Sequence, residues 1–206
     1  MTRQPRKHRT GLKAAFALED DHLPPLKTLA TVAFALLLAS TPFFAFTEGT
    51  GQYLREYLGL VWHLSMFFFI CKLPTPEWGK RAGTYWIVLD VLSGLLYINN
   101  LYGICGDLSL GIATVSLTLP NAVRYAAHIF EGLWLISSAV TTQNKLIKVC
   151  GVAAGTLLAA YSFACPFAPG WMLMLNVPFM LAWFYQIVRG RYMSYALSTA
   201  TTFPRG

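Results

Sequence analysis

The sequence predicts an all-α, polytopic integral membrane protein with six transmembrane helices. Charged residues make up only 12% of the 206 residues and hydrophobic residues 55%, whereas about 25% of a soluble domain is charged. The apolar residues gather in six runs of 17 to 20 residues, the length that a helix needs to cross a bilayer. The Lys and Arg residues concentrate at the N-terminus and in alternate linkers. Together these features exclude a disordered chain, a coiled coil and most soluble enzymes.

The first 27 residues are basic and contain the helix-breaking pair Pro24 and Pro25. We interpret residues 1–27 as a cytoplasmic tail with a short interfacial helix around Ala14–Leu18. Thr28–Phe46 is the first predicted span. The same run also fits a secretory signal peptide, with a cleavage site near Ala39–Thr41.

Five further runs complete the predicted transmembrane domain, 28–188. They are Tyr57–Leu73, Tyr85–Tyr102, Asn121–Val140, Leu146–Cys165 and Trp171–Val188. With the N-terminus inside, fourteen of the sixteen Lys and Arg residues lie on the cytoplasmic side, and only Arg55 and Arg124 lie near the outer face. This asymmetry follows the positive-inside rule. It predicts a protein of the bacterial cytoplasmic membrane, with both termini and the C-terminal tail, 189–206, in the cytoplasm.

The segment 108–120 is too apolar for a solvated loop. We expect it to be re-entrant or interfacial; the alternative is a seventh span, which would move the later linker cations outside, against the charge rule. Near the end of the chain, Pro178 follows Asn176 closely. This pair marks either a broken helix at a binding site or a simple kink.

Two predicted spans carry polar residues at helical spacing. The third holds Asp90, Ser93, Tyr97 and Asn100, and the fourth holds Asn121, Arg124, His128 and Glu131. In both, the spacing is i, i+3, i+7 and i+10, so each set forms a stripe on one helix face. Because lipid cannot satisfy polar groups, we expect the two stripes to face each other.

The stripes have two interpretations. In the first, the stripes are contacts between helices, with Arg124 paired to Glu131 and His128 hydrogen-bonded across the interface. Otherwise they line a polar path, because a chain of carboxylates and histidines relays protons or binds a cation. For the second case we predict the path or binding residues Asp90, Tyr97, Asn100, Arg124, His128 and Glu131.

Two histidines suggest a third chemistry. His63 and His128 lie about six and seven residues from the outer ends of their spans, which places both roughly 10 Å deep. Two imidazoles at matched depth could ligate a b-type haem. They could also bind a metal ion together with Glu131, which follows His128 by three residues.

The four cysteines contain no Cys-x-x-Cys pair, so a zinc or thioredoxin-like motif is not supported. The predicted topology puts Cys105 and Cys165 on the outer side and permits a disulfide between them. Nucleic-acid binding is not expected, because the basic residues follow the linkers and do not cluster on a soluble face.

These observations favour a small transporter or channel that moves a solute or ion along a polar path between the third and fourth spans. Its expected surroundings are the lipid bilayer and either other membrane subunits or further copies of itself. The first alternative is a non-catalytic subunit of a larger membrane complex. The second is a membrane-embedded haem or lipid-modifying enzyme that uses His63 and His128. The sequence favours a protein that is not an enzyme.

Overall fold

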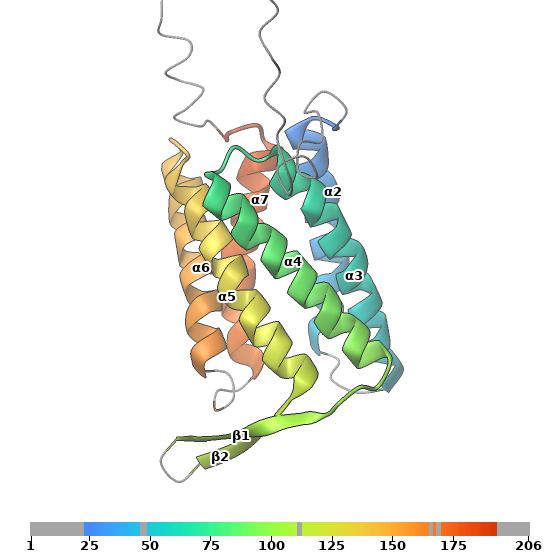
Figure 1. The fold of residues 1–206 in the computed structure, drawn as a ribbon. Coiled ribbons are helices and arrows are strands. Elements are labelled where there is room, and N and C mark those ends of the chain that lie inside the picture. Colours follow the sequence, from blue (N-terminus) through green and yellow to red (C-terminus); the bar gives the residue numbers. More distant parts are fainter. Residues whose placement is uncertain (1–22, 46–48, 111–112, 165–166, 168–169, 193–206) are drawn as a thin grey trace, which may run out of the picture.

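Antiparallel α-helices form a bundle in the computed structural model of the chain, which describes residues 23–45, 49–110, 113–164, 167 and 170–192 (Figure 1). Within these residues there are six α-helices, together with the 3₁₀ segments η2 (Thr41–Ala45) and η3 (Gly170–Asn176). The helices are α2 (Leu26–Ser40), α3 (Gly49–Lys72), α4 (Glu77–Ile98), α5 (Leu119–Val140), α6 (Lys145–Ala164) and α7 (Val177–Val188). The prediction of a mostly helical protein is confirmed.

The two ends of the bundle differ. At one end, which we call the linker end, the residues after α3, α5 and α7 meet: the Tyr192 hydroxyl lies 2.9 Å from the Ser138 carbonyl oxygen and 3.3 Å from that of Pro74. The helix boundaries put seven cations at or next to this end: Lys72, Lys80, Arg81, Lys145, Lys148, Arg189 and Arg191. The opposite end, which we call the hairpin end, carries a β-hairpin (Figure 1).

The re-entrant form of the prediction for 108–120 is wrong, because a β-hairpin lies here, whereas the interfacial form stays a prediction. Strands β1 (Ile104–Leu110) and β2 (Ala113–Thr118) pair antiparallel, and α5 begins at Leu119. The hairpin lies beyond the ends of the helices, so this segment does not re-enter the bundle (Figure 1). The residues Val115 and Leu117 alternate with Thr114, Ser116 and Thr118, which is the period of a strand.

Three helical segments are long and apolar enough to cross a membrane: Leu26–Phe43, Gly49–Lys72 and Lys145–Ala164. Large apolar side chains stand exposed on the outside of the bundle, among them Leu64, Val88 and Val149. Soluble monomers rarely expose extended apolar patches. Helices α4 and α5, which carry the predicted polar stripes, do not meet the same measure of length and hydropathy over the described residues.

Small residues let neighbouring helices pack closely. On α5 and α6, a Cβ atom added at Gly132 would lie 2.5 Å from the carbonyl oxygen of Gly155, and one added at Gly155 would lie 2.6 Å from that of Gly132. On α4, a Cβ at Gly79 would collide with Ser137 of α5. Such small residues at helix contacts are typical of membrane bundles, where close van der Waals packing holds helices together.

Aromatic rings fill the half of the bundle near the linker end. We call these rings the aromatic cluster; its members are Trp62, Phe69, Trp86, Trp134, Trp183 and Phe184, each within 6.2 Å of another between ring centroids. On α5, Trp134 follows Glu131 toward the linker end, and on α4 Trp86 precedes Asp90 on that same side. The aromatic cluster therefore closes the bundle on the linker side of the polar stripes.

The sixth predicted span changes from a 3₁₀ segment to an α-helix without interruption. The 3₁₀ segment η3 ends at Asn176, and α7 begins at Val177 with Pro178 in its first turn. Proline is tolerated there because the first amide groups of a helix have no partner within the helix. The second predicted span also differs, since α3 begins at Gly49 and not at Tyr57.

Candidate functional site

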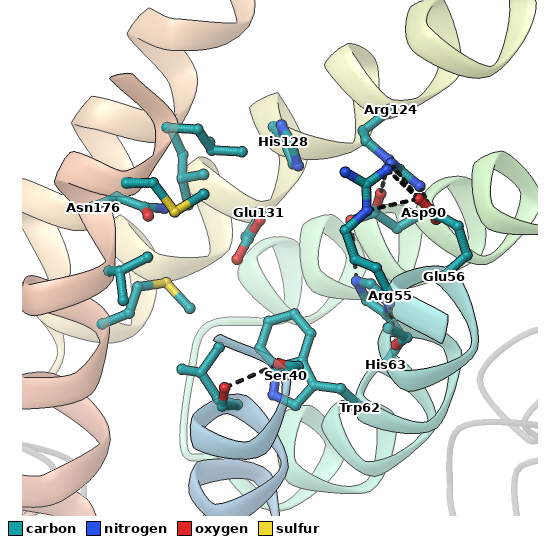
Figure 2. A pocket seen from close by; sticks show the side chains of 17 residues that line it. Ser40, Arg55, Glu56, Trp62, His63, Asp90, Arg124, His128, Glu131 and Asn176 are labelled. Atoms are coloured by element: carbon teal, nitrogen blue, oxygen red, sulfur yellow. Dashed lines mark hydrogen bonds and ion pairs between the residues drawn. The ribbon is translucent and has the colours of Figure 1, made fainter. Parts of the chain in front are cut away.

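A cavity of about 180 Å³ lies inside the bundle, between the two polar stripes and the junction of η3 and α7 (Figure 2). We call it the central cavity. Its polar lining residues are Ser40, Arg55, Glu56, His63, Asp90, Arg124, His128, Glu131 and Asn176. They come from α2, α3, α4, α5 and η3, so the cavity has more walls than the two helices that the sequence predicted.

The first polar group at the cavity is an ion pair between α5 and α3. Arg124 donates to both carboxylate oxygens of Glu56, at 3.1 Å from Nη1 and 2.5 Å from Nη2. Arg55 donates to the same carboxylate from Nε and Nη2, at 3.1 and 2.7 Å. Glu56 is 5% exposed, whereas Arg55 and Arg124 are about a fifth exposed. One buried carboxylate therefore holds two guanidinium groups in fixed positions.

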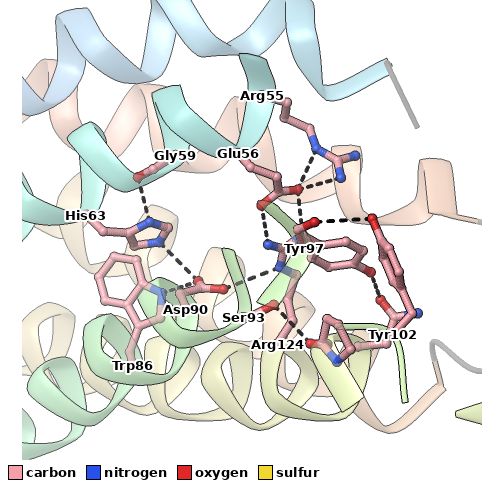
Figure 3. Close-up of polar contacts among 12 residues, drawn as sticks. Arg55, Glu56, Gly59, His63, Trp86, Asp90, Ser93, Tyr97, Tyr102 and Arg124 are labelled. Carbon is pink, nitrogen blue, oxygen red and sulfur yellow. Dashed lines mark hydrogen bonds and ion pairs between the residues drawn. The ribbon is translucent and has the colours of Figure 1, made fainter. Parts of the chain in front are cut away.

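Asp90 of α4 forms the second polar group (Figure 3). Its Oδ2 atom accepts a hydrogen bond from Trp86 Nε1 at 2.9 Å and lies 3.0 Å from Nε2 of His63. Its Oδ1 atom lies 3.6 Å from Nε of Arg124. Asp90 thus links α3, α4 and α5, and most of the capacity of Oδ1 to accept stays unused.

Both ring nitrogens of His63 are engaged. Nδ1 lies 2.7 Å from the carbonyl oxygen of Gly59, and since a carbonyl only accepts, Nδ1 donates this bond. Nε2 meets the Asp90 carboxylate. A haem or metal ligand needs a nitrogen with an available lone pair. In this arrangement His63 offers none, so the pairing of His63 with His128 around a haem iron is not favoured.

Glu131 and His128 form the third polar group and differ from the others. Glu131 is 4% exposed and His128 is 8% exposed. No described side chain forms a hydrogen bond or ion pair with the Glu131 carboxylate, and Nδ1 of His128 is buried without a hydrogen-bond partner. Figure 2 shows Glu131 between the ion pairs and Asn176. A buried carboxylate without a partner is costly, so a bound proton or cation would relieve that cost.

The far wall of the cavity is mostly apolar. Leu37, Leu158, Met174 and Met180 line it, and Asn176 supplies a polar side chain at the junction of η3 and α7. Asn176 is 7% exposed. This junction therefore brings one carboxamide to an otherwise apolar wall.

The predicted contact between Arg124 and Glu131 is wrong, because Arg124 pairs with Glu56 of α3. Four predicted site residues, Asp90, Arg124, His128 and Glu131, do line one cavity. The interface between α4 and α5 is itself closely packed, with Gly83 against Trp134. These four residues face the cavity shared with α3, whereas Ser93 donates a hydrogen bond across the α4–α5 interface to the Pro120 carbonyl oxygen.

Two predicted site residues lie elsewhere. Asn100 has a positive φ of 56° just after α4, the conformation that ends many helices, and its Oδ1 accepts a hydrogen bond from Tyr53 at 2.8 Å. The hydroxyl of Tyr97 donates to Asn121, and its ring lies 4.8 Å from the Arg124 guanidinium carbon. Tyr97 holds Arg124 in place, and Asn100 ends a helix.

Sequence reasoning missed Glu56 and Arg55 as parts of the site, since it placed both in a linker. A signal was present: Glu56, Gly59 and His63 are spaced i, i+3 and i+7, the same stripe pattern as on α4 and α5. The predicted Cys105–Cys165 bridge stays a prediction, because Cys165 lies outside the described residues.

Comparison of the chain with protein-family models, with curated proteins and with solved structures finds no match. The functional argument therefore rests on the chemistry of the central cavity.

Proposed function

We propose that the chain is a multi-pass membrane carrier for a small cation and that the central cavity is its binding site. In this proposal all six helices cross the bilayer, the linker end faces the cytoplasm, and the hairpin end faces outward. The exposed apolar side chains support a lipid environment. The seven cations at the linker end support the orientation, through the positive-inside rule.

The observation that carries the proposal is the unpaired Glu131 carboxylate in the cavity. Ionisable residues inside a membrane are costly and commonly mark ion or substrate pathways. The other two carboxylates of the site already have basic partners, in Arg55 and Arg124 for Glu56 and in His63 for Asp90. Glu131 is therefore the carboxyl group of the site that has no basic partner among the described residues.

The aromatic cluster favours a carrier over an open channel. It fills the bundle between Glu131 and the linker end with close-packed rings, so a cation at Glu131 would have no polar route onward without movement of helices. The change from η3 to α7 at Asn176 offers an element able to move, since a 3₁₀ stretch within a helix often marks a functional hinge.

Flux measurements in proteoliposomes test the proposal. We would reconstitute the protein and record currents on a solid-supported membrane for protons, Na⁺, K⁺ and Mn²⁺. We expect a protein-dependent current for at least one of these ions, lost in Glu131→Gln. It should be kept in the matched control Glu77→Gln, because Glu77 is 69% exposed and pairs only with Arg81 in the next turn. Currents equal to those of empty liposomes, or unchanged in Glu131→Gln, would contradict the proposal.

A further inference from the structure

We propose that Asp90, His128 and Glu131 form a binding site for one divalent transition-metal ion. Each offers one ligand atom, and these three atoms all lie within 4.8 Å of one another. That this ion is the transported cargo rests on the proposed function; the inference adds the chemical class of the cation. Binding itself is measured independently of transport.

The geometry is close to that of a loaded site. Bonds from zinc to histidine nitrogen or carboxylate oxygen are about 2.0–2.2 Å, so two ligands of one ion lie roughly 3–4 Å apart. The longest of these separations, at most 4.8 Å, needs to shorten by about an ångström when an ion binds. His128 and Glu131 sit one turn apart on α5, and Asp90 faces them from α4.

The unpartnered groups are independent support for a ligand. Within the described residues, the Glu131 carboxylate has no hydrogen bond or ion pair, and His128 Nδ1 is buried without a partner. Buried polar atoms normally have hydrogen-bond partners, and exceptions need an explanation such as an ion or water. A metal ion bound at the cluster would give Glu131 its partner.

The surroundings of Asp90 resemble the outer shell of a metal site. Ligating carboxylates are usually held by hydrogen bonds from neighbouring groups. Here Trp86 and His63 contact Oδ2 of Asp90, and Oδ1 has only the longer, 3.6 Å contact with Nε of Arg124, so Oδ1 is the oxygen with capacity for a metal. Arg124 has a second carboxylate partner in Glu56.

The ligand types select the class of ion. Imidazole suits zinc, copper, iron and nickel, whereas magnesium and calcium prefer oxygen ligands throughout. One imidazole with two carboxylates therefore favours a transition metal. The cavity volume of about 180 Å³ leaves room for water to complete the coordination, since a water molecule occupies about 30 Å³ in the liquid.

Calorimetric titration with Zn²⁺ and visible spectroscopy with Co²⁺ test the site on the full-length purified protein. We expect one Zn²⁺ per chain and a cobalt spectrum that contains a nitrogen ligand. Substitutions of residues that only hold a metal ligand in place weaken metal binding roughly 10–100-fold. Glu131→Gln and His128→Gln should each weaken Zn²⁺ binding by more than that. Glu77→Gln should bind as the unaltered protein does. Thermal unfolding of each variant identifies any that fail to fold. If one ligand variant does not fold, Zn²⁺ binding by the other tests the site.

The outcomes separate the two proposals. Absence of Zn²⁺ and Co²⁺ binding, or equal binding by folded ligand variants, overturns the metal site. A proton or Na⁺ current that depends on Glu131 would then still support the carrier. Conversely, tight binding lost in both ligand variants, without any Zn²⁺ flux in proteoliposomes, supports the metal site and contradicts transport of this ion.

Discussion

Replacing Glu56 with Gln should destabilise the protein more than replacing its partner Arg124. Glu56→Gln leaves two guanidinium groups, Arg55 and Arg124, without their shared carboxylate. Arg124→Gln leaves Glu56 still bound by Arg55, and Asp90 still bound by His63. The two substitutions therefore differ in how much uncompensated charge they leave in the bundle.

The magnitudes follow from this difference. Removing one partner of a buried ion pair costs about 3–5 kcal/mol. Because both arginines are about a fifth exposed, we expect the lower limit, about 3 kcal/mol, for Glu56→Gln. For Arg124→Gln we expect about 1.5 kcal/mol, the loss of hydrogen bonds to a charged group. With about 2–4 °C per kcal/mol for a chain of this size, the shifts in Tm are roughly 6–12 °C and 3–6 °C.

Thermal unfolding in detergent, followed by tryptophan fluorescence, measures both shifts. The matched control is Glu77→Gln, whose pair with Arg81 has an N–O separation of 3.7 Å and is mostly exposed; it should change stability by less than about 0.5 kcal/mol. Equal shifts for Glu56→Gln and Arg124→Gln, or shifts as small as the control, would refute the account of this charge network.

Two further predictions concern packing and topology. Gly155→Ala places a Cβ 2.6 Å from the Gly132 carbonyl oxygen, so it should destabilise the α5–α6 contact by about 1–3 kcal/mol in the same assay; Gly59→Ala, which meets open space, should not. Reporter fusions after Gly206 and within 74–83 should both read as cytoplasmic, because the linker cations follow the positive-inside rule. Equal effects of the two alanines, or an external signal from either fusion, would contradict these expectations.

Much of the site could be predicted from the sequence, because a helix in an apolar environment is expected to bury its polar residues on one face. The spacing of Arg124, His128 and Glu131 placed them on one stripe of α5, and they line one cavity with Asp90. Ion pairs between residues on different helices were harder to predict from the sequence. The assignment of Arg124 to Glu131 considered one helix only, whereas the actual partner, Glu56, lies 68 residues away in the chain.

The lengths of the apolar runs also could not predict where helices end or where strands form. Asn100 lay on the predicted stripe by spacing, but it ends α4 in a left-handed conformation, which spacing alone does not reveal. The segment 108–120 was predicted to be re-entrant or interfacial because it is too apolar for a solvated loop. Its alternating pattern from Ala113 to Thr118 is a period-two signal, which average hydropathy conceals. Pro178 left a broken helix and a simple kink both open; the structure has η3 followed directly by α7, with Pro178 in the first turn of α7.

Carbodiimide labelling of Glu131 in sealed vesicles tests most directly whether this carboxyl lies unpaired in the central cavity, and whether the cavity is reached from the hairpin side as the carrier proposal requires. A water-soluble carbodiimide with a small amine would be added from one side, and modified peptides would be located by mass spectrometry. We predict modification of Glu131 from the hairpin side only, and none of Glu56, which two arginines hold. Absence of label on Glu131 from the hairpin side, while the exposed Glu77 reacts from its own side, would contradict the account.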